Sequence, residues 1–221
     1  MYFVKTPAFF KYLFPNGTWK VETGVKKLFL TFDDGPIPQI TPWILDTLAA
    51  YDAKATFFCV GENAERYPEL VNRIVQEGHS IGSHTYNHLN GWNIDNNTYF
   101  LNVRKGAKIV GSNLFRPPYG KLKPKQAHFL SKHYQIVMWD ILSGDFDTKL
   151  SLEQVYHNII DHLEQGSIIV MHDSLKTMHH IQYSLPRLLQ FAGKNDFIFE
   201  GIEGDFNPVI KTHRMDNIVT I

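Results

Sequence analysis

The sequence predicts an α/β fold in which helices cover a parallel sheet. Short apolar runs alternate with amphipathic helical segments along the chain, which is the order expected of strand–helix units. The runs are apolar on both faces, as in a sheet that is buried on both sides. Polar clusters follow several of the runs, and the carboxyl ends of parallel strands open on one face. The spacing leaves a closed barrel and an open, doubly wound sheet as alternatives.

Seven strands and six helices follow from this pattern. The strands are expected at residues 27–32, 55–60, 80–83, 114–115, 135–140, 167–171 and 196–200. The helices are expected at residues 41–51, 68–77, 97–110, 125–132, 151–165 and 184–192. Thr41 is expected to cap the first helix, with Pro42 in its first turn, and Ser151 with Gln154 forms a capping box. No Gly-x-Gly-x-x-Gly follows the first strand, which argues against a dinucleotide-binding half.

The composition is that of one globular domain without a preference for a charged partner. The 221 residues are enough for one sizeable core, and 43% apolar with 20% charged residues is an ordinary balance. The 22 basic and 22 acidic residues cancel, which leaves no electrostatic footprint for nucleic acid or an anionic membrane. No stretch approaches the roughly 20 apolar residues of a membrane helix. A neutral or weakly charged substrate is therefore expected.

The first 25 residues carry no motif that can be read. We expect residues 1–25 to be an extension whose aromatic side chains dock on the domain formed by residues 26–221. The start of the chain lacks the basic flank, continuous apolar centre and cleavage site of a leader peptide. As written, the sequence predicts a cytosolic protein, and a mature exported form with its leader removed is the alternative. The oligomeric state cannot be read.

Two motifs at predicted strand ends suggest a metal site. Asp33 and Asp34 follow the first strand, and His84 and His88 follow the third. Histidines four residues apart on a helical turn face the same way, which suits two nitrogen ligands of one zinc ion, with an acidic oxygen as the third ligand and an open position for water. Taken alone, two loop histidines and an Asx turn explain these residues as well. Their convergence at matching strand ends favours the metal site, with one aspartate as ligand and its neighbour free.

The free aspartate and three later strand ends suggest hydrolytic chemistry. A free carboxylate near water on the metal can accept its proton, and Arg116 could hold that carboxylate ionised. Two prolines stiffen the following loop and could fix the Tyr119 amide as an oxyanion donor. His172 could protonate a leaving amine, and Asp145 could raise the pKa of His172. Each residue also has an ordinary structural explanation, as a surface arginine, a buried histidine or a turn aspartate.

At these residues the sequence resembles the polysaccharide deacetylases, carbohydrate esterase family four, also called the NodB-type homology domain. Five motifs of that family occur in order, spanning about two thirds of the chain. The clearest are TFDDGP at 31–36, HTYNH at 84–88, RPPYG at 116–120 and VMHD at 170–173. The resemblance implies a single-domain, distorted (β/α)7-type barrel whose active site lies at the carboxyl ends of the strands.

The resemblance also implies a role for each motif residue. It implies a divalent metal held by Asp34, His84 and His88, with Asp33 as base and His172 as acid. Zinc is expected first, with Co²⁺, Ni²⁺ and Mn²⁺ as alternatives.

Three further roles come from the same resemblance. Arg116 would orient Asp33, Asp145 would tune His172, and the Tyr119 amide would lie in the oxyanion hole.

The fourth motif departs from the family pattern Asp-x-x-Asp-Trp. In the stretch WDILSGDF at 139–146, Leu142 replaces the first aspartate and Phe146 replaces the tryptophan. Both changes put the tuning of His172 and the substrate preference in doubt. Aromatic residues near the motifs are candidates for a sugar-binding groove, although aromatic residues more often fill cores: Tyr86, Trp92, Trp139 and Phe146.

The predicted function is metal-dependent removal of N-acetyl groups from N-acetylglucosamine units of an oligo- or polysaccharide. Chitin oligomers, peptidoglycan, a surface glycan and a lipid-linked sugar precursor remain open as substrates. The alternatives are an amidase for small non-sugar amides, an acetyl-ester hydrolase, and a catalytically silent carbohydrate-binding barrel. The expected partner is an N-acetylated glycan, without nucleic acid.

Overall fold

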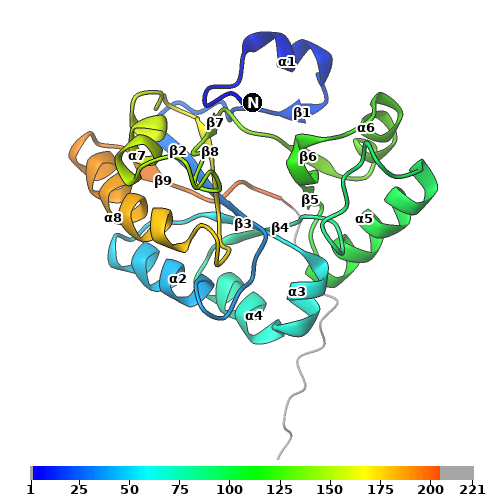
Figure 1. Cartoon of the computed structure of the whole chain (residues 1–221), viewed down its shortest axis with the longest axis horizontal. Helices are drawn as coiled ribbons and strands as arrows, with labels where there is room; N and C mark the ends of the chain where they lie inside the picture. Colours follow the sequence, from blue (N-terminus) through cyan, green and yellow to red (C-terminus); the bar gives the residue numbers. More distant parts are fainter. Residues whose placement is uncertain (1, 205–221) are drawn as a thin grey trace, which may run out of the picture.

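A curled sheet of parallel strands forms the centre of the protein (Figure 1). The computed structural model describes residues 2–204. The strands are β1 Gly17–Thr18, β2 Lys27–Asp33, β3 Thr56–Cys59, β4 Ser80–Ser83, β5 Leu114–Phe115, β6 Gln135–Val137, β7 Ile141–Leu142, β8 Ile168–His172 and β9 Ile198–Phe199. Their order in the sheet is β1-β6-β5-β4-β3-β2-β8-β7, with β9 paired to β2. This architecture confirms the distorted barrel and excludes the open, doubly wound sheet.

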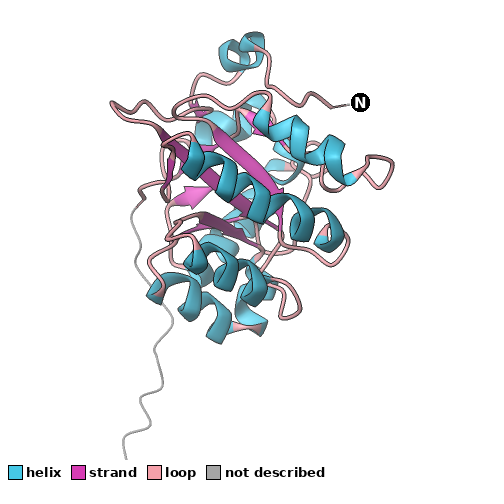
Figure 2. Cartoon of the chain, turned by 90° about the vertical axis from the view of Figure 1, so that its left-hand side faces the viewer, coloured by secondary structure: helices cyan, strands magenta, loops and turns pink. Residues whose placement is uncertain are grey.

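Helices lie outside the strands, as the side view shows (Figure 2). They are α1 Ala8–Leu13, α2 Thr41–Ala50, α3 Gly61–Arg66, α4 Pro68–Gln76, α5 Asn96–Val110, α6 Pro124–Leu130, α7 Leu152–Ile160 and α8 Met178–Lys194, with a 3₁₀ turn η1 at Pro118–Gly120. All seven predicted strands are present, whereas the short elements β1, β7, α1 and α3 were not predicted. Among these helices, none is long and apolar enough to cross a membrane.

The central strand β2 separates two apolar layers and aims the first aspartate into the barrel. Leu28, Leu30 and Phe32 pack outward in the cluster that includes the helices α2 and α8. Phe29 belongs instead to the inner cluster. Because side chains alternate along a strand, Asp33 shares the inner face with Phe29, while the next residue lies beyond the strand.

Residues 2–25, called the N-terminal extension below, lie across the open side of the sheet. β1 pairs with β6 through Gly17 and Ile136, and Lys5 forms an antiparallel bridge with Ile141 of β7. Lys5 Nζ also lies 2.7 Å from Oδ2 of the buried Asp140. The extension therefore contacts both edges of the sheet, with α1 between the two contacts (Figure 1).

Several predicted helix boundaries differ from the structure, most of all in α7 and α8. Thr41 is the first residue of α2 and does not cap it, because its hydroxyl accepts from Ile37 N and donates to the carboxylate of Asp173. Helix α7 ends at Ile160, and α8 begins at Met178, so the first is shorter and the second longer than predicted. The capping box of Ser151 and Gln154 is confirmed.

Candidate active site

The strand register brings the predicted residues to one rim of the barrel. Asp33 of β2 lies opposite His172 of β8, and Ser83 of β4 lies opposite Phe115 of β5. His84 and Arg116 are the residues that follow this pair, so both lie just beyond the carboxyl ends of their neighbouring strands. A pocket of about 610 Å³ opens at this rim, lined by Tyr2, Asp33, Asp34, His84, His88, Tyr119, Lys121, Trp139, Leu142, Phe146, Val170, His172, Ser174, Lys176 and Thr177.

Asp34, His84 and His88 form a cluster with the donor set of a divalent metal. Their ligand atoms all lie within 4.8 Å of one another. Oδ1 of Asp34 is 3.2 Å from Nε2 of His88 and 3.8 Å from Nε2 of His84. This oxygen is buried and has no hydrogen-bond partner, although buried polar atoms are normally paired. One carboxylate oxygen and two imidazole nitrogens therefore fit a cation such as zinc.

Electrostatics keep these side chains in the form that binds a metal. Burial alone would raise the pKa of Asp34, but the neighbouring His88, His172 and His84 hold it below its usual range. Burial lowers the pKa of His84 to about 4. Nδ1 of His84 lies 2.8 Å from the carbonyl oxygen of Arg116. A neutral imidazole must donate from Nδ1 there, which leaves the lone pair of Nε2 for the metal.

The backbone at the site is strained, and this corrects the predicted helical turn at residues 84–88. Four non-glycine residues of the rim have a positive φ: Asp34 (84°), Thr85 (63°), His88 (58°) and Tyr119 (61°). Such conformations cost free energy and persist where surrounding contacts determine them. Here an irregular turn, rather than a helix, brings both imidazoles to Asp34. The spacing of His84 and His88 is compatible with the donor cluster that they form here with Asp34, but the helical turn predicted from it is wrong.

Asp33 is buried beside the guanidinium of Arg116. Nη1 of Arg116 donates to Oδ1 of Asp33 over 2.8 Å and to Oγ1 of Thr31 over 2.6 Å. The hydroxyl of Thr31 donates in turn to the carbonyl oxygen of Ile169 over 2.7 Å. A buried carboxylate needs such a fixed positive partner to stay ionised.

His172 is held by Asp145 at two points. Oδ1 of Asp145 lies 2.7 Å from Nδ1 of His172, and Oδ2 accepts the backbone N–H of His172 over 2.7 Å. Burial opposes the protonated form of His172, but the charge and hydrogen bond of Asp145 outweigh it and raise the pKa to about 9. The edge of Phe146 meets the imidazole at 5.4 Å between ring centroids. With Nδ1 engaged, Nε2 is the ring nitrogen left for a substrate.

Two residues without a predicted role form hydrogen bonds to the segments that carry site residues. Oδ1 of Asp173 accepts the N–H of Gly35, next to the metal cluster, and Oδ2 accepts the hydroxyl of Thr41. Burial raises the pKa of Asp173 to about 8. His180 is buried in α8, and its Nδ1 lies 2.7 Å from the carbonyl oxygen of Asp145. Only the position of Asp173 beside His172 offered a signal in the sequence.

The four candidate groove aromatics lie in different places. Trp139 and Phe146 line the catalytic pocket, as does Leu142, which stands where the family often has aspartate. Trp92 is 56% exposed and lines a neighbouring groove. Tyr86 lines neither of these two pockets; its hydroxyl donates to Glu65, and Nζ of Lys105 lies 3.3 Å from its ring centre. These contacts give no support to its assignment to the groove.

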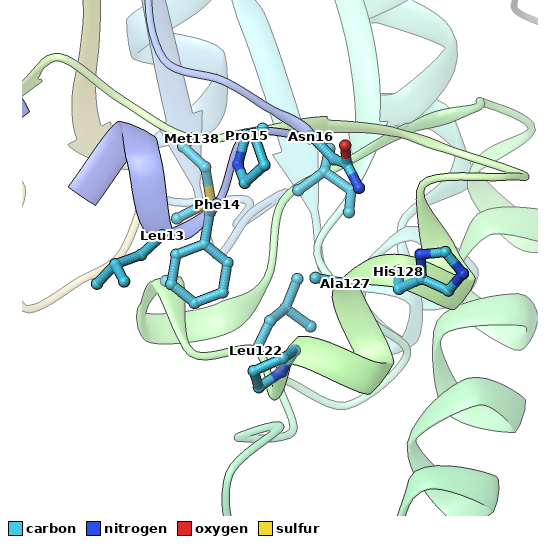
Figure 3. A pocket seen from close by; sticks show the side chains of 12 residues that line it. Leu13, Phe14, Pro15, Asn16, Leu122, Ala127, His128 and Met138 are labelled. Carbon is cyan, nitrogen blue, oxygen red and sulfur yellow. The ribbon is translucent and has the colours of Figure 1, made fainter. Parts of the chain in front are cut away.

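A second cavity under α1 contains none of the predicted catalytic residues. Figure 3 shows Leu13 and Phe14 of the N-terminal extension among the residues that line it, together with Leu122 and Ala127. Its volume is about 100 Å³, which is below the range of ordinary small-molecule sites. The chemistry therefore belongs to the larger pocket at the rim.

A comparison with known proteins finds a match to one protein family. The family described as polysaccharide deacetylase matches residues 20–137. A peptidoglycan-N-acetylglucosamine deacetylase of Bacillus cereus is 32% identical over 198 residues, covering 86% of this chain and 93% of that protein. A second B. cereus protein of the same description is 37% identical over 152 residues, covering 66% of this chain and 55% of its own length.

A solved structure has the same fold. The crystal structure of a peptidoglycan N-acetylglucosamine deacetylase superposes with a TM-score of 0.74 at 29% sequence identity. The match covers 89% of this chain and 94% of that one. The present chain spans only about half of one curated relative but nearly all of the other.

Proposed function

Because the chain belongs to the polysaccharide deacetylase family, we propose that it removes the N-acetyl group from N-acetylglucosamine units of a glycan. Peptidoglycan is the first substrate to test, since both B. cereus relatives carry that description. The observation that carries the proposal is the pairing of two proton carriers beside one cluster of metal donors. Asp33 is paired to Arg116 and His172 to Asp145, which a protein that only binds sugar does not need.

Asp34, His84 and His88 would hold the divalent cation, with zinc as the first expectation and Co²⁺, Ni²⁺ or Mn²⁺ as alternatives. A cation bound there supplies a Lewis acid that polarises the acetyl carbonyl and makes water easier to deprotonate.

The chain's own residues would move the protons. Asp33, oriented by its hydrogen bond from Arg116, accepts a proton from the water whose oxygen attacks the acetyl carbon. The backbone N–H of Tyr119 donates to the oxyanion that forms. His172, kept protonated by Asp145, delivers its proton to the amide nitrogen as the carbon–nitrogen bond breaks. Acetate and a free amine on the sugar are the products.

Acetate release from peptidoglycan fragments and N-acetylglucosamine oligomers tests the proposal. We expect release that a chelator abolishes and added Zn²⁺ restores. An enzyme that spares these glycans but cleaves a small aryl acetamide would be an amidase for small amides. Preference for acetylated xylan would make it an ester hydrolase, and binding of the oligomer without release under any metal would make it a silent binder.

A further inference from the structure

The N-terminal extension forms an apolar groove beside the catalytic pocket. This extension groove has a volume of about 300 Å³ and is lined by Tyr2, Phe3, Thr6, Pro7, Phe10, Phe14, Trp19, Trp92, Tyr119, Gly120, Lys121, Met138, Trp139 and Leu142. Half of these residues belong to the extension and half to the barrel rim. We infer that the extension groove is a subsite for a further sugar of the same glycan chain whose acetyl group is hydrolysed, an inference that rests on the proposed function.

The groove walls are held in place by hydrogen bonds between the extension and the barrel. The N–H of Thr6 donates to the carbonyl oxygen of Asp140 over 2.9 Å, and its hydroxyl donates to the carbonyl oxygen of Trp139 over 2.8 Å. The N–H of Leu142 donates to the carbonyl oxygen of Val4 over 2.8 Å. Trp139 and Leu142 are themselves groove residues, so both sides of the groove are fixed to one another.

The groove is continuous with the catalytic pocket. Five residues line both: Tyr2, Tyr119, Lys121, Trp139 and Leu142. Tyr2 extends from the extension to the loop after β7, where its hydroxyl donates to Asp147 over 3.2 Å and its ring meets Phe146. A molecule that fills the groove therefore touches the walls of the site of hydrolysis. The simplest such occupant is covalently joined to the sugar in that site.

The lining suits the face of a sugar ring better than a charged group. Lys121 is the only residue with a formal charge among those that line the groove, and its ammonium lies 5.3 Å from the ring centre of Trp92. The indole of Trp92 is oriented by a hydrogen bond to the carbonyl oxygen of Leu122 over 3.1 Å. Oriented, partly exposed aromatic rings offer flat apolar faces for the C–H groups of a neutral sugar, and polar tips for its hydroxyls.

Phe3 and Phe9 provide a matched pair of substitutions. Both rings contact Phe10, with centroids at 6.0 and 5.0 Å, and both side chains are more than half exposed. Only Phe3 lines the groove. Phe3→Ala and Phe9→Ala should therefore disturb folding to a similar, small extent and differ in their effect on the subsite.

The kinetic test compares N-acetylglucosamine oligomers from the disaccharide to the pentasaccharide. We expect Phe3→Ala to lower kcat/KM for the pentasaccharide about 3–10-fold, mainly through KM, because uniform binding is lost. The loss should be smaller for the disaccharide, and Phe9→Ala should match the wild type for both. Equal losses for all lengths, or the same losses in both variants, would overturn the subsite.

A binding test separates the subsite from the proposed function. In an Asp33→Asn background, the pentasaccharide Kd measured by calorimetry should be about 3–10-fold weaker with Phe3→Ala than with Phe9→Ala. This difference without any acetate release in the parent protein would refute the deacetylase and leave the subsite standing. Acetate release by the parent protein together with identical Kd values in the two variants would support the deacetylase and refute the subsite.

An acyl chain is the competing occupant of an apolar groove. If an octyl glycoside of N-acetylglucosamine were a better substrate than the pentasaccharide, and Phe3→Ala removed that advantage, the groove would belong to a lipid tail and the sugar subsite would be wrong.

Discussion

Nη1 of Arg116 lies 2.8 Å from Oδ1 of Asp33, and the whole arginine side chain is buried. The other nitrogens of the same guanidinium donate to backbone carbonyl oxygens, Nε to Val137 over 3.2 Å and Nη2 to Met138 over 2.9 Å. Arg116, which follows β5, therefore joins the end of β6 to the β2 aspartate proposed as the base. Its fixed fork of donors positions the carboxylate as well as neutralising it.

Arg116→Lys should destabilise the protein and weaken turnover together. A lysine ammonium cannot reach Asp33 and both carbonyl oxygens from one position, so buried acceptors lose their partners. We expect the free energy of unfolding in urea to fall by about 3–5 kcal/mol. Arg104→Lys, the same substitution at an exposed position of α5, is the control. Equal urea midpoints in the two variants would show that the hydrogen bonds of the Arg116 guanidinium contribute little to stability.

Asp33→Asn should leave the metal content unchanged, whereas Asp34→Asn should lower it. Asp33→Asn keeps the shape beside Arg116 but loses the base, so kcat should fall about 10²–10⁴-fold with metal content unchanged. Asp34→Asn should lose the ion and the increase in melting temperature that added Zn²⁺ gives the wild type. Metal analysis and a thermal melt measure both. Loss of the ion from Asp33→Asn instead would mean that the roles of the two aspartates are exchanged.

Asp145→Asn should move the basic limb of the pH–rate profile to lower pH. The carboxylate of Asp145 favours protonated His172, whose pKa is raised to about 9, and an acid catalyst works only while it is protonated. Without that charge the pKa of His172 falls, so kcat/KM should begin to decline about 1–3 pH units earlier. Steady-state rates between neutral and alkaline pH measure the shift. An unchanged basic limb together with a lower rate at every pH would assign Asp145 a purely structural role.

Gly35→Ala should disrupt the loop that carries Asp34. A Cβ at this position would lie 1.8 Å from Oδ2 of the buried Asp173, so the carboxylate or the loop must move. We expect a loss of at least about 1–3 kcal/mol in unfolding free energy and weaker metal binding. Gly193→Ala has open space around its Cβ and lies in α8, where alanine is favoured over glycine. It should leave stability unchanged or raise it.

The sequence predicts those elements of the fold whose own residues show a recognisable apolar pattern. Each of the seven predicted strands follows from an apolar run, and all seven are present. The strand β1 consists of Gly17 and Thr18, which form no apolar run, and β7 comes directly after the predicted strand 135–140, so the sequence shows no boundary between them. Both strands exist because of their partners. Helix α1 has no buried residue, so it leaves no amphipathic signal.

The site is predictable in composition but not in geometry. The spacing of His84 and His88 suggested two ligands, yet nothing in the local sequence requires the positive φ of Thr85 and His88. The contact of Asp173 with Gly35 joins residues 138 positions apart, and no pattern in a single sequence records such a pair. The contacts of Tyr86 with Lys105 and Glu65 are likewise not visible in the sequence pattern.

Lys5 and Asp140 are separated by 135 positions along the chain. On the ribosome, residues 4–6 are made long before the segment on which they dock, and contacts of such long range are slow to form. We therefore expect the extension to join the barrel late in folding. A terminal segment that is added last can change its side chains during evolution while the barrel and its carboxylates persist. Recognition of distant sugars could in this way diversify among relatives that share one chemistry.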